Sequence, residues 1–166
     1  LYIIKRFRSP WSAEKFLYMK KICLTCQREL SEEEYTGKRN VCKRCTSFQR
    51  NRTRSSSPEA YLTVVCAKLK SARKNMEWEL DMEHIKSLWQ QQLGRCALSG
   101  VFMTWHAGEG KQDLNVSIDR KDPNKGYIIG NIQLVAQRVN TMKHTLGDSE
   151  FYWWCKNIAY NKERKA

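Results

Sequence analysis

Three side chains between positions 119 and 144 could hold a metal ion together. Asp119 lies near the end of the strand-like segment Val116-Ser-Ile-Asp-Arg, and Asn140 and His144 stand four residues apart in a segment with helical periodicity. Residues with this spacing share one face of a helix, so Asn140 and His144 can approach the same ion while Asp119 approaches from the strand. A carboxylate oxygen, an amide oxygen and an imidazole nitrogen suit magnesium or manganese, with zinc or nickel as alternatives.

Four cysteines form a second candidate metal site. Cys23-Leu-Thr-Cys26 and Cys42-Lys-Arg-Cys45 are separated by fifteen residues, a spacing that brings four thiolates to one structural zinc ion. The segment between them is polar, so the metal is expected to supply most of its stability. The alternative is that these thiols are buried or oxidised without a metal.

Between the cysteines and the first candidate site, the sequence predicts a basic linker and two helices. Residues 48–57, FQRNRTRSSS, lack apolar periodicity and are interpreted as a linker or a phosphate-contacting arm. Pro58 then opens one helix, and Asp81 caps a second. The apolar faces of both helices are expected in the core, where Cys66 and Cys96 are interpreted as buried residues rather than ligands.

From Arg95 onward, short apolar runs broken by glycines predict strands and turns. The runs cover residues 96–103, 116–120 and 127–135. A helical period resumes at Ala136 and continues to about Lys143. Asp148 is expected to cap a last amphipathic helix, whose apolar residues are Phe151, Trp154 and Ile158.

The composition favours a polyanionic partner. The 166 residues carry 30 Lys and Arg against 17 Asp and Glu, a net charge of +13, and 41% are hydrophobic, as in a folded globular protein. Residues 1–57 hold 14 basic and 5 acidic side chains, a net of +9, so this part is expected to bind phosphates. A solvated basic surface without a specific partner is the alternative.

The sequence has no continuous apolar stretch of the length that a membrane span needs. Its start lacks the apolar run of a signal peptide, and paired C-x-x-C motifs suit a reducing compartment, so a cytoplasmic location is expected. Met19-Lys-Lys-Ile-Cys reads like a natural start. Residues 1–18 are therefore expected to be an extension, although Ser12 to Tyr18 has a helical pattern.

The segment from about Leu93 to Leu146 resembles the HNH (ββα-metal) endonucleases, especially their short phage-type members. Sequences of that kind run Gly-x-Cys-x-x-Ser/Thr-Gly, then Ser-x-Asp-Arg, Gly-Tyr, Asn-x-x-Leu-Val and Asn-x-x-Lys. The similarity covers about a third of the chain. The matching residues are Gly94, Cys96, Ser99, Gly100, Ser117, Asp119, Arg120, Gly126, Tyr127, Asn131, Leu134, Val135, Asn140 and Lys143.

The resemblance implies a role for each matching site residue. Asp119 and Asn140 would bind a catalytic magnesium or manganese ion, with His144 as a third ligand, and the ion would stabilise charge on the scissile phosphate. Asn131 would orient the catalytic loop. Phosphate contacts are expected from Arg50, Arg52, Arg54, Lys121, Arg138 and Lys143.

Arg120 stands where HNH enzymes usually carry a general-base histidine. Arginine stays protonated, so it cannot take a proton from water at neutral pH. Three interpretations stay open: His106 or Asp122 supplies the base, the metal-activated water needs none, or the domain has kept the fold and lost cleavage. Arg120 is still expected to act at the catalytic site, because a guanidinium can stabilise a pentavalent phosphorane.

Together these patterns predict an α+β protein that nicks double-stranded DNA with a catalytic magnesium or manganese ion and a structural zinc ion. Alternatives are a catalytically inactive HNH-fold DNA-binding module and an RNA-binding zinc protein. The resemblance suggests a phage or mobile-element origin and a host cytoplasm. The oligomeric state stays open. A homodimer is one possibility, and a double-strand break in a single event would need it.

The expected order along the chain is an extension in residues 1–18, a four-cysteine zinc module in 19–50, a basic linker and helical connector in 51–92, a ββα-metal nuclease unit in 93–146 and a C-terminal helix in 147–166.

Overall fold

The computed structural model describes residues 20–37, 39–108 and 110–165. The predictions for residues 1–18 and for a start at Met19 lie outside the described residues. The chain divides into two compact units, Leu1–Thr53 and Arg54–Ala166. None of the helices that the structure describes is long and apolar enough to cross a membrane.

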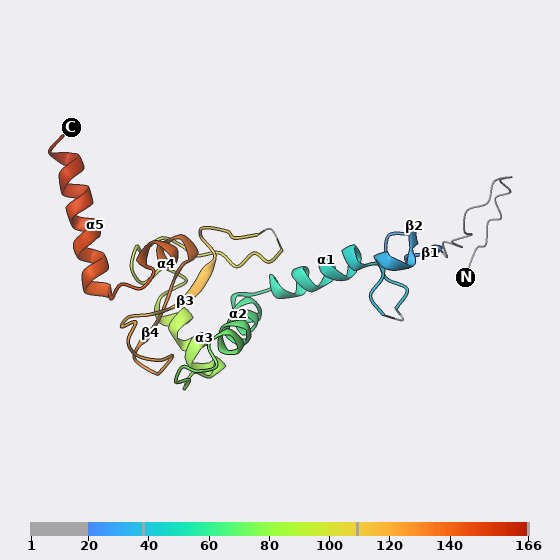
Figure 1. Cartoon of the computed structure of the whole chain (residues 1–166), viewed down its shortest axis with the longest axis horizontal. Helices are drawn as coiled ribbons and strands as arrows, with labels where there is room; N and C mark the ends of the chain where they lie inside the picture. The colour runs from blue at the N-terminus through green and yellow to red at the C-terminus, as the bar shows by residue number, and fades with distance from the viewer. Residues whose placement is uncertain (1–19, 38, 109, 166) are drawn as a thin grey trace, which may run out of the picture. The chain divides into compact units, whose positions relative to one another are not determined.

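The first unit is a small fold around the two cysteine pairs (Figure 1). Strands β1 (Lys20–Ile22) and β2 (Glu29–Ser31) pair antiparallel, and the 3-10 helix η1 (Glu32–Glu34) follows. The buried core contains Cys23, Tyr35 and Cys42, and the Tyr35 hydroxyl donates a hydrogen bond of 2.7 Å to the Lys21 carbonyl. So small a core stabilises a fold only weakly, which agrees with a metal as its main support.

Helix α1 (Lys43–Arg54) begins directly after Cys42 and includes Cys45, the other member of the second cysteine pair, in its first turn. It carries five Lys and Arg, no acidic residue and no buried residue. Residues 48–54 of the predicted linker or phosphate-contacting arm are therefore helical. Their sequence shows no apolar periodicity because neither face of the helix packs on a core. The non-helical segment between α1 and the next helix consists of residues 55–57 alone.

The second unit is built on an antiparallel hairpin of β3 (Val116–Arg120) and β4 (Ile132–Ala136). Asp119 lies opposite Gln133 in the hairpin, and all of β4 is buried. Helix α4 (Gln137–Lys143) follows β4 directly and packs on both strands, which completes a ββα arrangement. The predicted α+β class, with a ββα unit and a four-cysteine module able to hold zinc, is confirmed.

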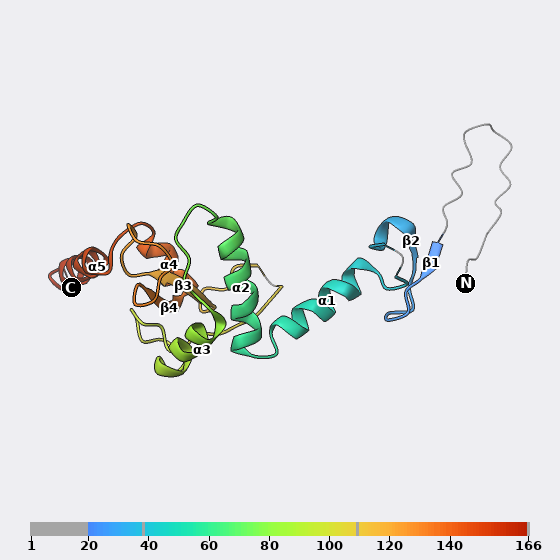
Figure 2. The ribbon, with the colours of Figure 1, turned by 90° about the horizontal axis from the view of Figure 1, so that it is seen from below.

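Helices α2 (Pro58–Ala72) and α3 (Met82–Gln91) cover the hairpin (Figure 2). Pro58 begins α2 and Asp81 caps α3, as predicted, with the Asp81 carboxylate accepting a hydrogen bond of 2.7 Å from the His84 N–H. Both helices share one core with β3 and β4. This core also buries Cys66 and Cys96, as predicted.

The strand predicted at residues 96–103 is not formed. These residues make turns, with one isolated bridge between Arg95 and Phe102. Gly100 adopts a φ of +71°, a left-handed conformation that interrupts an extended segment. The strand predicted at 127–135 is also shorter than expected, because residues 127–131 belong to the loop that precedes β4.

The last helix, α5 (Asp148–Glu163), begins where the sequence predicts but has a different cap. Its N-cap is Gly147, while the Asp148 carboxylate lies 3.2 Å from the ammonium of Lys143. Phe151 is buried, whereas Trp154 and Ile158 are 49% and 67% exposed. The predicted apolar stripe therefore packs only at the first turn of the helix.

Candidate functional site

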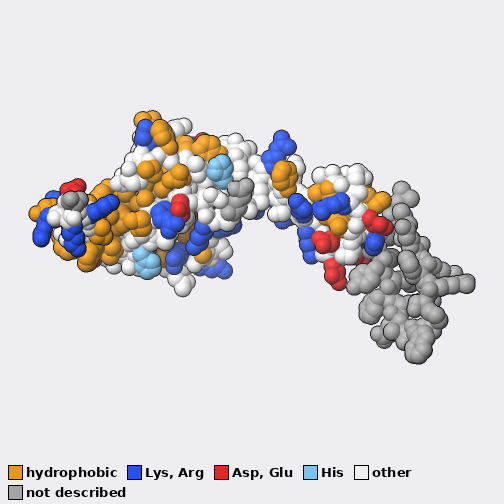
Figure 3. Space-filling model, turned by 90° about the horizontal axis from the view of Figure 1, so that it is seen from above, with side chains coloured by type: hydrophobic (Ala, Val, Ile, Leu, Met, Phe, Trp, Pro, Cys, Tyr) orange, Lys and Arg blue, Asp and Glu red, His pale blue; other side chains and the backbone are white. Residues whose placement is uncertain are grey.

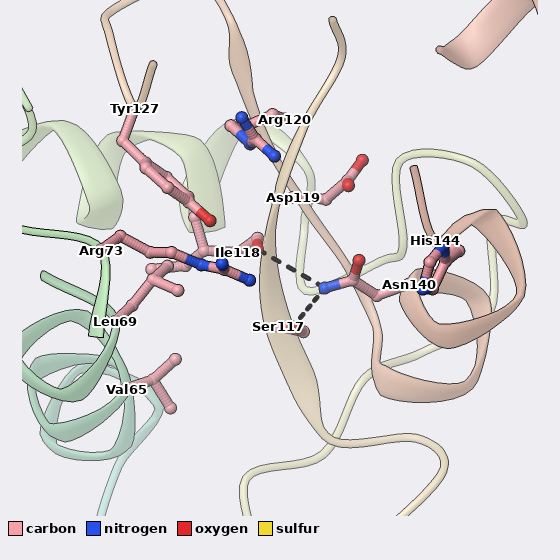
Figure 4. Close-up of a pocket in the computed structure, with 10 residues that line it drawn as sticks. All are labelled: Val65, Leu69, Arg73, Ser117, Ile118, Asp119, Arg120, Tyr127, Asn140 and His144. Carbon is pink, nitrogen blue, oxygen red and sulfur yellow. Dashed lines mark hydrogen bonds between the residues drawn. The ribbon is translucent and has the colours of Figure 1, made fainter. Parts of the chain in front are cut away.

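A pocket of about 190 Å³ is lined by residues of α2, β3 and α4 and of the loop between the strands (Figure 4). It brings together Asp119, Arg120, Asn140 and His144, all of which the sequence analysis selected as site residues. Since a liquid water molecule takes about 30 Å³, the volume is sufficient for a phosphate group together with an ion. The other lining residues are Val65, Leu69, Arg73, Ser117, Ile118 and Tyr127.

Asp119 projects from β3 and is only 6% exposed. Its Oδ2 accepts a hydrogen bond of 3.0 Å from Gln133 Nε2 and lies 3.0 Å from Lys143 Nζ. Its Oδ1 has no partner among the described residues. Since no described side chain leaves a buried nitrogen or oxygen without a partner, Oδ1 must reach solvent, and the pocket that Asp119 lines is the opening to it.

Asn140 extends from α4 towards β3 (Figure 4). Its Nδ2 donates hydrogen bonds of 2.7 Å to Ser117 Oγ and 3.5 Å to the Ile118 carbonyl. These two bonds fix the plane of the amide. The Oδ1 atom of Asn140 is left without a donor from the described residues and can therefore face a cation.

His144 lies directly after α4, with an exposed ring and a φ of +53°. The helix ends at Lys143, so His144 reaches the pocket from a turn and not from the helix face that its spacing to Asn140 predicts. Its Nδ1 lies 3.3 Å from Thr145 Oγ1. The Nε2 atom has no partner among the described residues.

The pocket thus offers three candidate ligand atoms: Asp119 Oδ1, Asn140 Oδ1 and His144 Nε2. Two oxygens and one imidazole nitrogen fit a divalent ion such as magnesium or manganese. Among the described residues, only the four cysteines bring three or more His, Cys, Asp or Glu ligand atoms close together. A metal in this pocket would therefore depend on the amide of Asn140.

Arg120 lines the pocket, but its guanidinium is already engaged. Its Nη1 donates hydrogen bonds of 2.7 Å and 3.0 Å to the carbonyls of Pro123 and Lys125, and its Cζ lies 5.3 Å from the centre of the Tyr127 ring. Arg120 thus fastens the loop that follows β3.

The two alternative bases, His106 and Asp122, are not among the described residues that line the pocket. Asn115 holds the backbone of His106: its Oδ1 accepts from the His106 N–H at 2.9 Å, and its Nδ2 donates to the His106 carbonyl at 2.7 Å. The Asp122 carboxylate accepts a hydrogen bond of 2.9 Å from the Asn124 N–H in its own loop. Neither side chain is therefore a member of the described pocket lining.

Asn131 ties together the loop between β3 and β4. Its Oδ1 accepts from the Asp122 N–H at 3.0 Å, and its Nδ2 donates to the carbonyls of Asp122 and Gly126 at 3.1 Å and 3.0 Å. Gly126 is required at its position, because a Cβ there would lie 2.5 Å from the Glu77 carbonyl oxygen. Asn131 therefore acts on the loop and is not part of the described pocket lining.

Arg73 is a pocket residue that the sequence analysis did not select. It is the exposed C-cap of α2, and its guanidinium points towards β3, with the strand between it and Asn140 (Figure 4). The described residues provide it with no ion pair or side-chain hydrogen bond, so it is available to an anion. The only signal in the sequence is a basic helix end, which Lys70 and Lys74 share.

The prediction that Lys143 contacts a phosphate is wrong, because its side chain is buried. Lys143 is 1% exposed, and its Nζ donates a hydrogen bond of 2.6 Å to the Arg120 carbonyl. Lys121 and Arg138 remain exposed, Lys121 with a hydrogen bond to the Gly130 carbonyl and Arg138 with an ion pair of 2.8 Å to Asp113. Neither Lys121 nor Arg138 is among the described residues that line the pocket.

The four cysteines of the first unit have sulfur atoms that all lie within 4.8 Å of one another. Around zinc, with bonds of about 2.3 Å, they would lie roughly 3.8 Å apart, so a small contraction closes the site. The Cys42 N–H donates to Cys23 Sγ at 3.3 Å and lowers the pKa of Cys23 to about 6, whereas burial raises the pKa of Cys45 to about 12. Cys23 is therefore a thiolate at neutral pH, and metal binding has to displace the proton of Cys45.

Comparison with known proteins gives one match to a solved structure. No family model matches the sequence, and no curated protein matches it. A solved structure that is similar is that of the rare-cutting HNH restriction endonuclease PacI, with 16% sequence identity and a TM-score of 0.41. The match covers 87% of this chain and 97% of that one.

The cysteine geometry predicts one zinc ion per chain, which elemental mass spectrometry of the purified protein measures. Cys23→Ser is expected to abolish zinc retention, because it removes the thiolate whose lowered pKa favours the first metal bond. Cys155→Ser, a half-buried thiol outside the group, is the matched control and should keep the zinc. Equal zinc loss in both variants, or no zinc in the wild type, would contradict the site.

Proposed function

We propose that this protein is a metal-dependent DNA endonuclease of the HNH type, which hydrolyses phosphodiester bonds. The observation that supports the proposal most is the meeting of Asp119, Asn140 and His144 at one pocket, each with an acceptor atom that no described residue occupies. These are the ligands that the sequence resemblance implies. A phage or mobile-element origin and a host cytoplasm belong to the same proposal.

In the proposed mechanism, Asp119 Oδ1, Asn140 Oδ1 and His144 Nε2 hold a magnesium or manganese ion. When bound, the ion supplies charge stabilisation to the phosphate and the leaving 3′ oxygen. Arg73 binds a phosphate oxygen from the side of the pocket opposite α4, where its guanidinium has no competing anion among the described residues. With one proposed catalytic site per chain, the product of one event is a nick.

Arg120 and Asn131 serve the reaction by holding the loop after β3. Arg120 binds the carbonyls of Pro123 and Lys125, and Asn131 binds the backbone of Asp122 and Gly126. A pocket wall with these bonds needs little reorganisation when substrate enters, which favours the transition state.

One observation favours a second candidate function. The engaged guanidinium of Arg120, together with the absence of His106 and Asp122 from the described pocket lining, leaves the pocket without the usual general base. The second candidate is therefore a DNA-binding module that keeps the fold and does not cleave. Cleavage assays decide between the two.

Helix α1 is proposed as the principal DNA contact of the first unit. None of its residues is buried, and blue Lys and Arg side chains follow it in Figure 3. Arg50 and Arg54 lie on one side of the helix and Arg52 on the other, so the helix can meet phosphates of both strands that border a groove. An α-helix fits into the major groove of B-form DNA.

We expect the full-length protein to nick supercoiled plasmid with magnesium or manganese and to be inhibited by EDTA. Asn140→Ala should lower the nicking rate by at least about 100-fold, since it removes a proposed ligand of the ion. Asn161→Ala, an exposed amide on α5 outside the pocket, should nick at the wild-type rate. If the wild type shifts DNA in a gel but does not cut it with any metal, the binding-module candidate is correct.

Arg73→Ala is expected to lower the nicking rate by about 100-fold, because it removes a charged donor to the phosphate at the pocket. Arg73→Lys should recover part of the rate. The control is Lys74→Ala, the neighbouring exposed cation, which does not line the pocket. Equal effects of Arg73→Ala and Lys74→Ala would show that only general basic charge matters.

Joint replacement of Arg50, Arg52 and Arg54 by alanine is expected to weaken binding to a short DNA duplex. The slope of log affinity against log salt concentration should fall by about 0.9 for each phosphate that the helix no longer neutralises. Fluorescence anisotropy over a salt series measures both quantities. The control variant replaces Lys156, Lys162 and Arg164 near the C-terminus, and an equal weakening there would refute a specific role for α1.

A further inference from the structure

Lys143 is a fully buried cation that the proposed mechanism does not use. Its Nζ lies 2.6 Å from the Arg120 carbonyl oxygen, 3.0 Å from Asp119 Oδ2 and 3.2 Å from Asp148 Oδ1. The contact with the Arg120 carbonyl is a hydrogen bond, and the contacts with the two carboxylates are ion pairs. Lys143 therefore joins three elements: α4, which it ends, β3 through Asp119 and Arg120, and the first turn of α5 through Asp148.

Gln133 makes the second bridge between the same two carboxylates. Its Nε2 donates to Asp119 Oδ2 at 3.0 Å and to the Asp148 oxygens at 2.9 Å and 3.1 Å. Asp119 Oδ2 thus accepts one hydrogen bond, from Gln133, and forms an ion pair with Lys143. These two contacts at one oxygen restrict the rotation of the carboxylate, and with it the direction of Oδ1.

The charges in this cluster explain why both carboxylates are needed. Lys143 and Asp119 are 1% and 6% exposed, and a buried cation next to the proposed ligand repels a divalent ion. Asp148 supplies a second negative charge on the same ammonium, so the cluster of two Asp and one Lys keeps a net charge of −1. Asp148 thereby offsets the repulsion without occupying the pocket, whose described lining does not include it.

We propose that Lys143, Gln133 and Asp148 are positioning residues that hold Asp119 Oδ1 in the direction of the pocket, and that the first turn of α5 is thereby a part of the metal site. This inference rests on the proposed function, because it takes Asp119 as a metal ligand. The backbone supports the link to α5: the Asp148 N–H donates to the Lys121 carbonyl at 3.2 Å, next to the end of β3.

The test measures manganese binding to the full-length, zinc-loaded protein without DNA, from the free-ion signal in electron paramagnetic resonance. Asp148→Asn keeps the shape of the side chain and removes its charge. It is expected to raise the manganese dissociation constant at least about tenfold, as removal of a partner of a metal ligand typically does. Asp148→Glu should recover part of the affinity. Circular dichroism and zinc content confirm that each variant is folded.

Gln133→Met is the second variant, which removes the hydrogen bond to Asp119 Oδ2 without touching a charge, and it decides the matter if Asp148→Asn does not fold. Asp113→Asn is the control, since that carboxylate is exposed and pairs with Arg138. Wild-type affinity in folded Asp148→Asn and Gln133→Met, alongside metal-dependent nicking by the wild type, would overturn the positioning role and leave the nuclease proposal intact. A wild type that binds no manganese and does not nick would overturn both.

Discussion

The second unit depends on helices that pack on both faces of its two-stranded hairpin. Two strands alone are marginally stable in water, so β3 and β4 need packing partners. Side chains alternate along β3: Ile118 faces the apolar core with α2 and α3, while Ser117 and Asp119 face α4. Helices α2 and α4 pack on the hairpin from opposite sides. Arg73, at the end of α2, and Asn140, in α4, both line the pocket beside β3.

Much of this arrangement could be predicted from the sequence, because the signals are local. A short apolar run predicted β3, the helical period predicted α4, and Pro58 and Asp81 marked the starts of α2 and α3. The cysteine spacing located the four-thiol group for the same reason, since two tight turns with paired ligands are encoded in a few adjacent residues.

The remainder could not be predicted because it depends on contacts between distant segments. Arg73 lies far from residues 119–144 in sequence, and only the packing of α2 on β3 brings it to the pocket. Lys143 looks like an ordinary basic residue at a helix end, and its burial depends on Asp148 across a turn. Helix α1 was missed because an apolar pattern reports burial, and α1 has none.

The length of the α1 segment depends on whether it is helical or extended. A helix of 12 residues with no buried side chain is near the length at which helices are marginal in water, so its free energy of unwinding is small. As a helix it measures about 18 Å, and fully extended roughly 40 Å. The difference, about 20 Å, corresponds to roughly six base pairs of B-form DNA. In the proposed function, in which both units bind one DNA duplex, the segment between Cys45 and the start of α2 therefore acts as an extensible tether, which tolerates variable spacing between the two proposed points of attachment.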